Sequence, residues 1–270
     1  MGVAWRYLRL LGSLGRYTLA RELAFRGNFL VKVSVEVLWL SILLAFYATV
    51  FGATTTIAGW TRYEYLFFVG CYYALNGLTE TLFLENCNEF AELVRTGDLD
   101  FLLLKPIDEQ FMITCRRVDW ATAPNVLLGG ALMAYSLYQM NWHFNPLHAA
   151  MFVVLFGCGT AICYAFMVML TSLSVWMVRN QGLMEMWWLF SSLARYPKEI
   201  FGVQPWSQPL GIVFTFIVPI LLVVNVPADV MVRTFDWRVV GYTLVATAAL
   251  LWASRRFFQH ALRSYRSASS

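Results

Sequence analysis

Acidic side chains recur at helical spacing in the longest polar stretch of the chain, which lies between strongly apolar runs. Glu85, Glu89, Glu92 and Arg95 are three or four residues apart, so a helix would place them on one face. Phe90 and Leu93 would fall on a different face. A short amphipathic helix with an acidic face is suited to bind another protein, so this stretch is a candidate recognition element.

The same stretch continues into a turn and an apolar run. Gly97 is a favourable residue for ending a helix, and the acidic Asp98 and Asp100 follow it. The Phe-Leu-Leu-Leu run at 101–104 would be costly if it were left in water, which argues against a simple solvated loop. We therefore predict a protein-binding region over 86–111, with a helix over about 86–97. Its predicted contact residues are Glu89, Phe90, Glu92, Leu93, Arg95, Asp98 and Asp100.

Few residues suit other chemistry. The sequence has no Gly-x-x-x-x-Gly-Lys-Ser/Thr phosphate loop, so the chain is not expected to bind ATP in that manner. The three histidines fall in predicted loops or in the C-terminal region, and no Ser/His/Asp set occurs on suitable elements. The five cysteines form no CxxC pair. We expect no catalytic residue, metal site or cofactor in this chain, and no nucleic-acid partner.

The composition is that of a membrane protein. Hydrophobic residues make up 59% of the 270 residues and charged residues only 13%, whereas soluble domains have about 45–50% and about 25%. The apolar runs are continuous rather than alternating, which favours helices over transmembrane strands. We therefore predict an all-α integral membrane protein that forms a single membrane domain over 1–270.

The apolar runs fit six transmembrane helices. Spans are predicted at about 29–51, 65–84, 120–138, 149–178, 183–196 and 239–254. The run at 209–226 is short and interrupted by proline, and it is predicted to enter the membrane and return on the same side. It belongs to a predicted extracytoplasmic or re-entrant region over 198–238. Arginines and apolar residues separate onto two helical faces within 4–18, so the region 1–28 is predicted to hold a helix in the membrane interface.

The distribution of basic residues predicts the orientation. Lys and Arg concentrate in the N-terminal region, the 85–118 segment, the 178–182 turn and the C-terminal region. The opposite side would hold only Arg62, Arg195, Lys198, Arg233 and Arg238. The positive-inside rule therefore places both termini in the cytoplasm of a chain in the cell (inner or plasma) membrane. An even number of spans follows, so only one of the two short segments, 183–196 or 209–226, is expected to cross fully.

Ionisable side chains are few within the predicted spans, and such groups are costly in lipid. Lys32 and Glu36 are one helical turn apart and can neutralise each other. Glu80 is interpreted either as a capped, paired structural residue or as part of a substrate path. Three aromatic residues either belong to an interfacial belt or line that path: Trp187, Trp188 and Tyr196.

The segment Gly-Asp-Leu-Asp-Phe-Leu-Leu-Leu-Lys-Pro at 97–106 resembles a signature of the ABC-2 type permeases. The segments 195–201 and 216–228 resemble later parts of the same family, and the resemblance runs in order along the whole chain. It implies six membrane helices and an N-terminal interfacial helix. It also implies a cytoplasmic coupling helix between the second and third spans, and a hairpin that dips into the membrane before the last span.

The resemblance also implies a function. The chain would be the permease subunit of an ATP-binding cassette (ABC) exporter, and ATP and Mg²⁺ would be bound by a separate cytoplasmic ATPase in two copies. A second permease, of the same or a different chain, would complete the membrane dimer in the lipid, and the substrate is not specified. Two other classes stay open. An ion-coupled secondary carrier would depend on a buried carboxylate such as Glu80, and a non-transporting assembly subunit would bind no ATPase.

Overall fold

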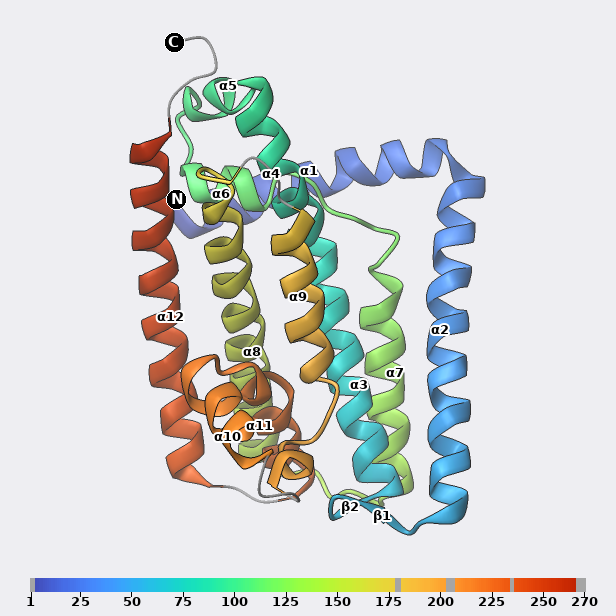
Figure 1. Ribbon diagram of the computed structural model, residues 1–270. Coiled ribbons are helices and arrows are strands. Elements are labelled where there is room, and N and C mark those ends of the chain that lie inside the picture. Colours follow the sequence, from blue (N-terminus) through green and yellow to red (C-terminus); the bar gives the residue numbers. More distant parts are fainter. Residues whose placement is uncertain (1–2, 178–180, 203–206, 234–235, 266–270) are drawn as a thin grey trace.

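The computed structural model describes residues 3–177, 181–202, 207–233 and 236–265 and is almost entirely helical. Long helices run side by side in a bundle (Figure 1). They are α2 (Arg26–Ala53), α3 (Arg62–Thr79), α7 (Pro124–Gln139), α8 (Pro146–Leu173), α9 (Gln181–Leu193) and α12 (Trp237–Ser264). At one end of the bundle lies a short antiparallel hairpin, β1 (Thr56–Ile57) and β2 (Trp60–Thr61). We call this the hairpin end.

The amphipathic N-terminal segment forms α1 (Val3–Ala24), which lies across the opposite end of the bundle (Figure 1). Trp120 Nε1 donates a hydrogen bond to the Gly15 carbonyl at 2.9 Å, and the Tyr7 hydroxyl accepts one from Asp108 N at 3.1 Å. Burial raises the pKa of Glu22, whose carboxylate accepts a hydrogen bond from Trp120 N. The helix is therefore held against the segment that leads into α7.

One continuous helical path runs from the hairpin end to the other end of the bundle. Helix α3 passes directly into a five-residue π-helical segment, η1 (Glu80–Leu84), and then into α4 (Glu85–Thr96). The predicted second span and the predicted binding helix are therefore parts of one continuous helix. The short helices α5 (Leu99–Leu103) and α6 (Glu109–Thr114) follow at the same end as α1, which we call the α4 end.

Glycines let α3 and α7 approach closely. A Cβ atom on Gly129 would lie 2.5 Å from the Ala74 backbone nitrogen and 2.6 Å from the Gly70 carbonyl oxygen. Gly77 faces Asn125 in the same way, with a Cβ-to-Cβ approach of 2.7 Å. Small residues at membrane helix contacts permit such backbone packing. Nothing lies within 4 Å of the corresponding position at Gly130, so only one residue of the Gly-Gly pair forms the contact.

The segment between α9 and α12 is bent rather than straight. It comprises η2 (Lys198–Gly202), α10 (Gln208–Ile212), η3 (Val213–Ile217) and α11 (Ile220–Val232). The helical stretches Gln208–Ile217 and Ile220–Val232 meet at 86°. Pro219 lies at the break, where a proline cannot donate the backbone hydrogen bond that would continue the helix. Helix α11 is buried against α8, where a Cβ on Gly159 would meet the Val223 carbonyl oxygen at 2.5 Å.

A charged network joins three chain segments at the hairpin end. Lys198 Nζ lies 2.6 Å from Asp229 Oδ2, and Lys198 N donates to Asn225 Oδ1 at 2.8 Å. The Arg233 guanidinium lies 4.5 Å from the centre of the Trp60 ring, and Trp60 Nε1 donates to the Glu199 carboxylate at 3.0 Å. The region 198–238 is thus tied to the β-hairpin by buried and half-buried charges.

Length and apolar composition select α2 and α8 as candidate membrane spans in the described part of the chain. The bent pair Gln208–Ile217 and Ile220–Val232 would be a third if it crosses as one span. The six-span layout therefore stays a prediction, and Val178, at the end of the predicted fourth span, lies outside the described residues. Only 6% of the most apolar stretch of α2 is buried, so this helix presents its side chains to lipid or to another subunit.

Candidate coupling surface and transport cavity

Helix α4 has one face buried in the chain and one end exposed. Phe90 is 0% exposed and packs in an apolar cluster with Leu99, Ile113, Val168 and Phe258. The helix ends at Gly97, whose φ of 81° is the left-handed conformation that glycine adopts without strain. The sequence predicted this stop, and it predicted that Phe90 would lie on a different face from the charged residues. Phe90 itself is an internal packing residue, so it is not available for direct contact with a partner.

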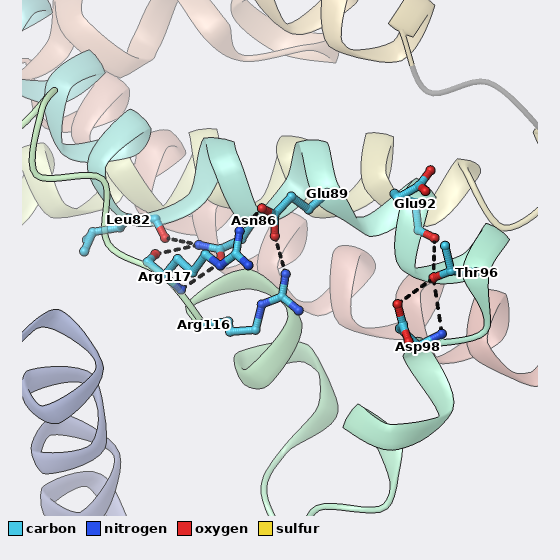
Figure 2. A network of polar contacts seen from close by, with 8 residues as sticks. All are labelled: Leu82, Asn86, Glu89, Glu92, Thr96, Asp98, Arg116 and Arg117. Atoms are coloured by element: carbon cyan, nitrogen blue, oxygen red, sulfur yellow. Dashed lines mark hydrogen bonds and ion pairs between the residues drawn. The ribbon is translucent and has the colours of Figure 1, made fainter. Parts of the chain in front are cut away.

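Glu89 is neutralised within the chain. Its carboxylate forms ion pairs with the guanidinium groups of Arg116 and Arg117, in the segment that leads to α7 (Figure 2). Asn86 reinforces this joint, because its side chain donates to the Arg117 carbonyl at 2.8 Å and accepts from Arg117 N at 2.9 Å. Burial lowers the pKa of the Arg116 guanidinium from its usual value, but the group stays a cation at neutral pH.

The exposed end of α4 carries the charges that remain free to meet a partner. Glu92 and Arg95 form an ion pair at 2.5 Å and are both largely exposed, and the hydrogen bond from Arg95 lowers the pKa of Glu92. Thr96 Oγ1 donates to Asp98 Oδ2 at 2.8 Å and so holds the exposed Asp98 carboxylate beside them (Figure 2). Leu93 is partly buried against the apolar cluster that contains Phe90. Asp100 is half-buried.

Two large apolar residues extend this exposed end and are not among the contact residues that the sequence predicts. Phe101 is 70% exposed and Leu104 is 81% exposed. The signal was the Phe-Leu-Leu-Leu run, but the run alone does not say which members face outward. Leu102 is buried and Leu103 is partly buried. We call the group Glu92, Arg95, Asp98, Phe101 and Leu104 the coupling surface.

The segment that follows the coupling surface in the chain is attached to the last helix. Arg255 on α12 forms an ion pair with Asp108 at 2.5 Å and donates to Gln110 Oε1 at 3.2 Å. Asp108 also caps α6, because its Oδ1 accepts from Phe111 N at 3.0 Å. A force on this end of the molecule would therefore reach both α3 and α12.

A second site lies inside the bundle. A cavity of about 480 Å³ opens between α2, α3, α7 and the segment from Trp188 to Arg195. Polar side chains from each of these elements face it: Glu36, Asn76, Glu80, Asn125, Ser191 and Arg195. Aromatic rings complete the lining, among them Trp39, Tyr72 and Trp188.

Two of the four predicted substrate-path residues line the cavity and two do not. Glu80 and Trp188 line it. Trp187 is 1% exposed and packs in the bundle core near Phe166, and Tyr196 lies outside the lining. Trp187 and Trp188 are neighbours on one helix and point in directions about 100° apart, and here only Trp188 is in the cavity lining. The sequence predicted that Glu36 could pair with Lys32. In the structure its carboxylate instead accepts a hydrogen bond from Asn125.

A family model described as ABC-2 family transporter protein matches residues 37–269. The chain belongs to the ABC-2 transporter family. It is therefore a membrane protein, the permease subunit of an ABC transporter, and the family implies association with an ABC ATPase. Comparison with curated proteins and with solved structures gives no significant match.

Family membership gives the two sites of this ABC-2 permease a common context. The coupling surface lies at the end of α4, and the cavity opens beside Glu80, at the start of η1. Within the described residues, no group of three or more His, Cys, Asp or Glu side chains could hold a metal ion.

Proposed function

We propose that this ABC-2 permease moves a substrate outward across the cell (inner or plasma) membrane, using ATP hydrolysed by a separate cytoplasmic ATPase. One observation carries the proposal. The helix that bears Glu92 and Arg95 of the coupling surface is continuous with the helix that bears Glu80 in the cavity. A partner bound to the first site can therefore displace the second, because no flexible loop lies between them.

The proposed mechanism follows from this continuity. ATP and Mg²⁺ bind to two ATPase subunits and bring them together, and the coupling surface moves with them. The continuous helix formed by α3, η1 and α4 transmits the displacement to the cavity. The cavity, which was open to one side of the membrane, then opens to the other. The π-helical segment at Glu80–Leu84 is a favourable point for this change, because π-helical turns interrupt regular hydrogen bonding and often occur at functional sites.

A membrane dimer is part of the proposal. The almost fully exposed α2 forms one wall of the cavity, so a second permease of the same or a different chain could close it from that side. Exposed rings such as Trp39 and Phe46 on α2 would then be covered by protein or by substrate instead of lipid. Six spans, with α1 in the interface and 208–232 re-entrant, complete the proposed layout.

Single cysteines introduced on a cysteine-free background are expected to report the topology. The proposed orientation predicts that an impermeant thiol reagent added to intact cells reaches cysteines at Thr55, Gly202 and Arg238, but not one at Phe101. Permeabilised cells provide the control, because Phe101 is 70% exposed and should then react. Labelling of position 101 from outside would reverse the topology, and labelling of 202 and 238 from opposite sides would make 208–232 a full span.

Purification of the tagged chain from native membranes in mild detergent is expected to recover an ATPase with a phosphate loop. ATP hydrolysis by the recovered complex should depend on that subunit, because this chain has no phosphate loop of its own. The control is a purification of an unrelated membrane protein carrying the same tag. Recovery of membrane proteins alone would contradict the proposed assembly.

An ion-coupled carrier is the second candidate, because two carboxylates, Glu36 and Glu80, face the cavity. Transport measured in reconstituted vesicles distinguishes the carrier from the ATP-driven exporter. Transport that continues without ATP and follows an imposed proton gradient would favour the carrier, whereas transport that requires internal ATPase and ATP would favour the exporter.

A further inference from the structure

The cavity between α2, α3, α7 and α9 is lined by two carboxyl groups and one guanidinium group. Glu36 and Glu80 face it, and Arg195 is the one basic residue in its described lining. The Arg195 guanidinium lies 5.4 Å from the centre of the Tyr72 ring, and its Nη2 lies 3.5 Å from the Tyr72 hydroxyl. None of the ion pairs in the described part of the chain includes Glu36, Glu80 or Arg195. The two carboxylates therefore have no ion-pair partner among the residues that the structure describes.

Each carboxylate is held in place by one amide. Asn76 Nδ2 donates to Glu80 Oε1 at 2.7 Å, and Asn125 Nδ2 donates to Glu36 Oε2 at 2.8 Å. These bonds fix the two side chains and leave the second oxygen of each free, among the described residues, to accept from a ligand. Two carboxylates at one site repel each other in a low-dielectric environment unless a cation lies near them.

Asn125 supplies an independent sign of a missing ligand. Its side chain is only 5% exposed and lines the cavity, yet its Oδ1 accepts no hydrogen bond from any described residue. A buried acceptor without a donor is costly, so native structures seldom leave one unpaired. Because this free atom is an acceptor, its partner would donate from an N–H or O–H group, whereas Arg195 Nε, which is also buried without a partner among the described residues, would need an acceptor. A permanently methylated cation or a halide could not supply that N–H or O–H group.

The remaining wall suits the apolar body of such a ligand. Trp39, Phe46 and Trp188 line the cavity and are at least half exposed. Aromatic faces attract cations and cover apolar groups. A volume of about 480 Å³ lies within the range that holds drug-sized molecules.

We propose that the cavity binds an amphipathic molecule through a protonated amine. The ammonium N–H groups bond to Glu36, Glu80 and Asn125, and the apolar body lies on Trp39, Phe46 and Trp188. An anionic ligand is disfavoured, because two carboxylates face the space that its charge would enter. That the bound amine is the transported substrate rests on the proposed function, but the binding itself does not.

Equilibrium binding to the full-length chain in lipid nanodiscs tests the proposal without ATP or an ATPase. The probes share one dansyl body: dansylcadaverine with a protonated amine, its N-acetyl derivative without charge, and dansyl-aminocaproic acid with a carboxylate. Energy transfer from tryptophan to dansyl reports occupancy, and empty nanodiscs correct for partition into lipid. Saturable binding of the amine is expected, with a Kd about tenfold or more below that of either analogue, since one lost charged contact of this kind costs a factor of this order.

Substitutions locate the site. Glu36→Gln and Glu80→Gln keep the hydrogen bond from asparagine and remove only the charge, so each should raise the Kd of the amine about tenfold and leave that of the acetylated probe unchanged. Arg195→Gln should leave amine binding unchanged or tighten it, because it removes a like charge. Glu185→Gln is the matched control, since Glu185 is exposed on α9 and does not line the cavity.

The outcomes are distinct. Equal binding of the amine and its acetylated analogue by the unmodified chain, or no saturable binding of the amine, would overturn the proposal without any variant being needed. Retention of amine affinity in both Gln variants would also overturn it. Amine binding by a chain that recruits no ATPase would uphold the proposal and contradict only the proposed function.

Discussion

Replacing Gly129 by alanine is expected to destabilise the membrane domain severely, whereas the same replacement at Gly130 should be tolerated. The new methyl group at 129 would lie 2.5 Å from the Ala74 nitrogen and 2.6 Å from the Gly70 oxygen. Both are backbone atoms, so no rotamer change can make room. The helices must separate, which loses van der Waals contacts along α3 and α7. Overpacking typically costs about 1–3 kcal/mol, and we expect a loss of about 3 kcal/mol or more here because the clash is with backbone.

Thermal stability of the detergent-solubilised chain measures this effect. Gly129→Ala should lower the midpoint of loss of the monodisperse peak, and Gly130→Ala should match the unmodified chain. Gly159 and Gly157 offer a second matched pair on α8. A Cβ at 159 would meet the Val223 oxygen at 2.5 Å, and nothing lies within 4 Å at 157. Equal stability of Gly129→Ala and Gly130→Ala would show that α3 and α7 do not pack as described.

Charge reversal at the coupling surface is expected to abolish ATPase coupling while the membrane domain stays folded. Glu92→Lys combined with Asp98→Lys places two positive charges where a partner would meet two negative ones. Mismatched charges at an interface are strongly unfavourable, so we expect the ATPase retained on the permease to fall about tenfold or more. Both side chains are exposed and their hydrogen bonds are local, so thermal stability should change little compared with a variant that breaks the buried pairs of Glu89. The measurements are ATPase retention and substrate-stimulated hydrolysis by the reconstituted complex.

Glu89→Gln is the contrasting variant on the same helix. Because Glu89 pairs with Arg116 and Arg117 inside the chain, its removal should cost about 2 kcal/mol and lower thermal stability. A face of acidic residues would have suggested that Glu89 and Glu92 act alike, and the ion pairs of Glu89 separate them. If the Glu92 and Asp98 double variant retains its ATPase and transports like the unmodified chain, the coupling surface lies elsewhere.

The positions of the helices could be read largely from the sequence. The predicted runs 29–51 and 149–178 correspond to α2 (Arg26–Ala53) and α8 (Pro146–Leu173), and the helix stop at Gly97 is confirmed. These features depend on local properties: a run of apolar residues, a proline that cannot donate, and a glycine that accepts positive φ. The class of membrane permease followed from composition and from a motif, which are also properties of the linear chain.

The joint between α3 and α4 was less visible. A polar stretch after an apolar run predicts the start of a new element, but the helix continues through η1. Polarity marks where a helix leaves the apolar layer, and it does not mark where its backbone hydrogen bonds end. The sequence had no Gly or Pro between Glu80 and Thr96 to stop it.

Only the tertiary structure decided which side chains meet. Glu36 and Asn125 are 89 residues apart, and Arg116 lies 27 residues from Glu89. Whether Glu89 or Glu92, and Trp187 or Trp188, faces inward depends on the rotation of each helix about its axis, and one residue turns a helix by about 100°. That rotation is set by contacts such as Gly129 against Ala74, between segments distant in sequence. The hydropathy of a segment is a sum over its own residues and contains no information on such contacts, so the sequence determined the helices and their packing determined the cavity.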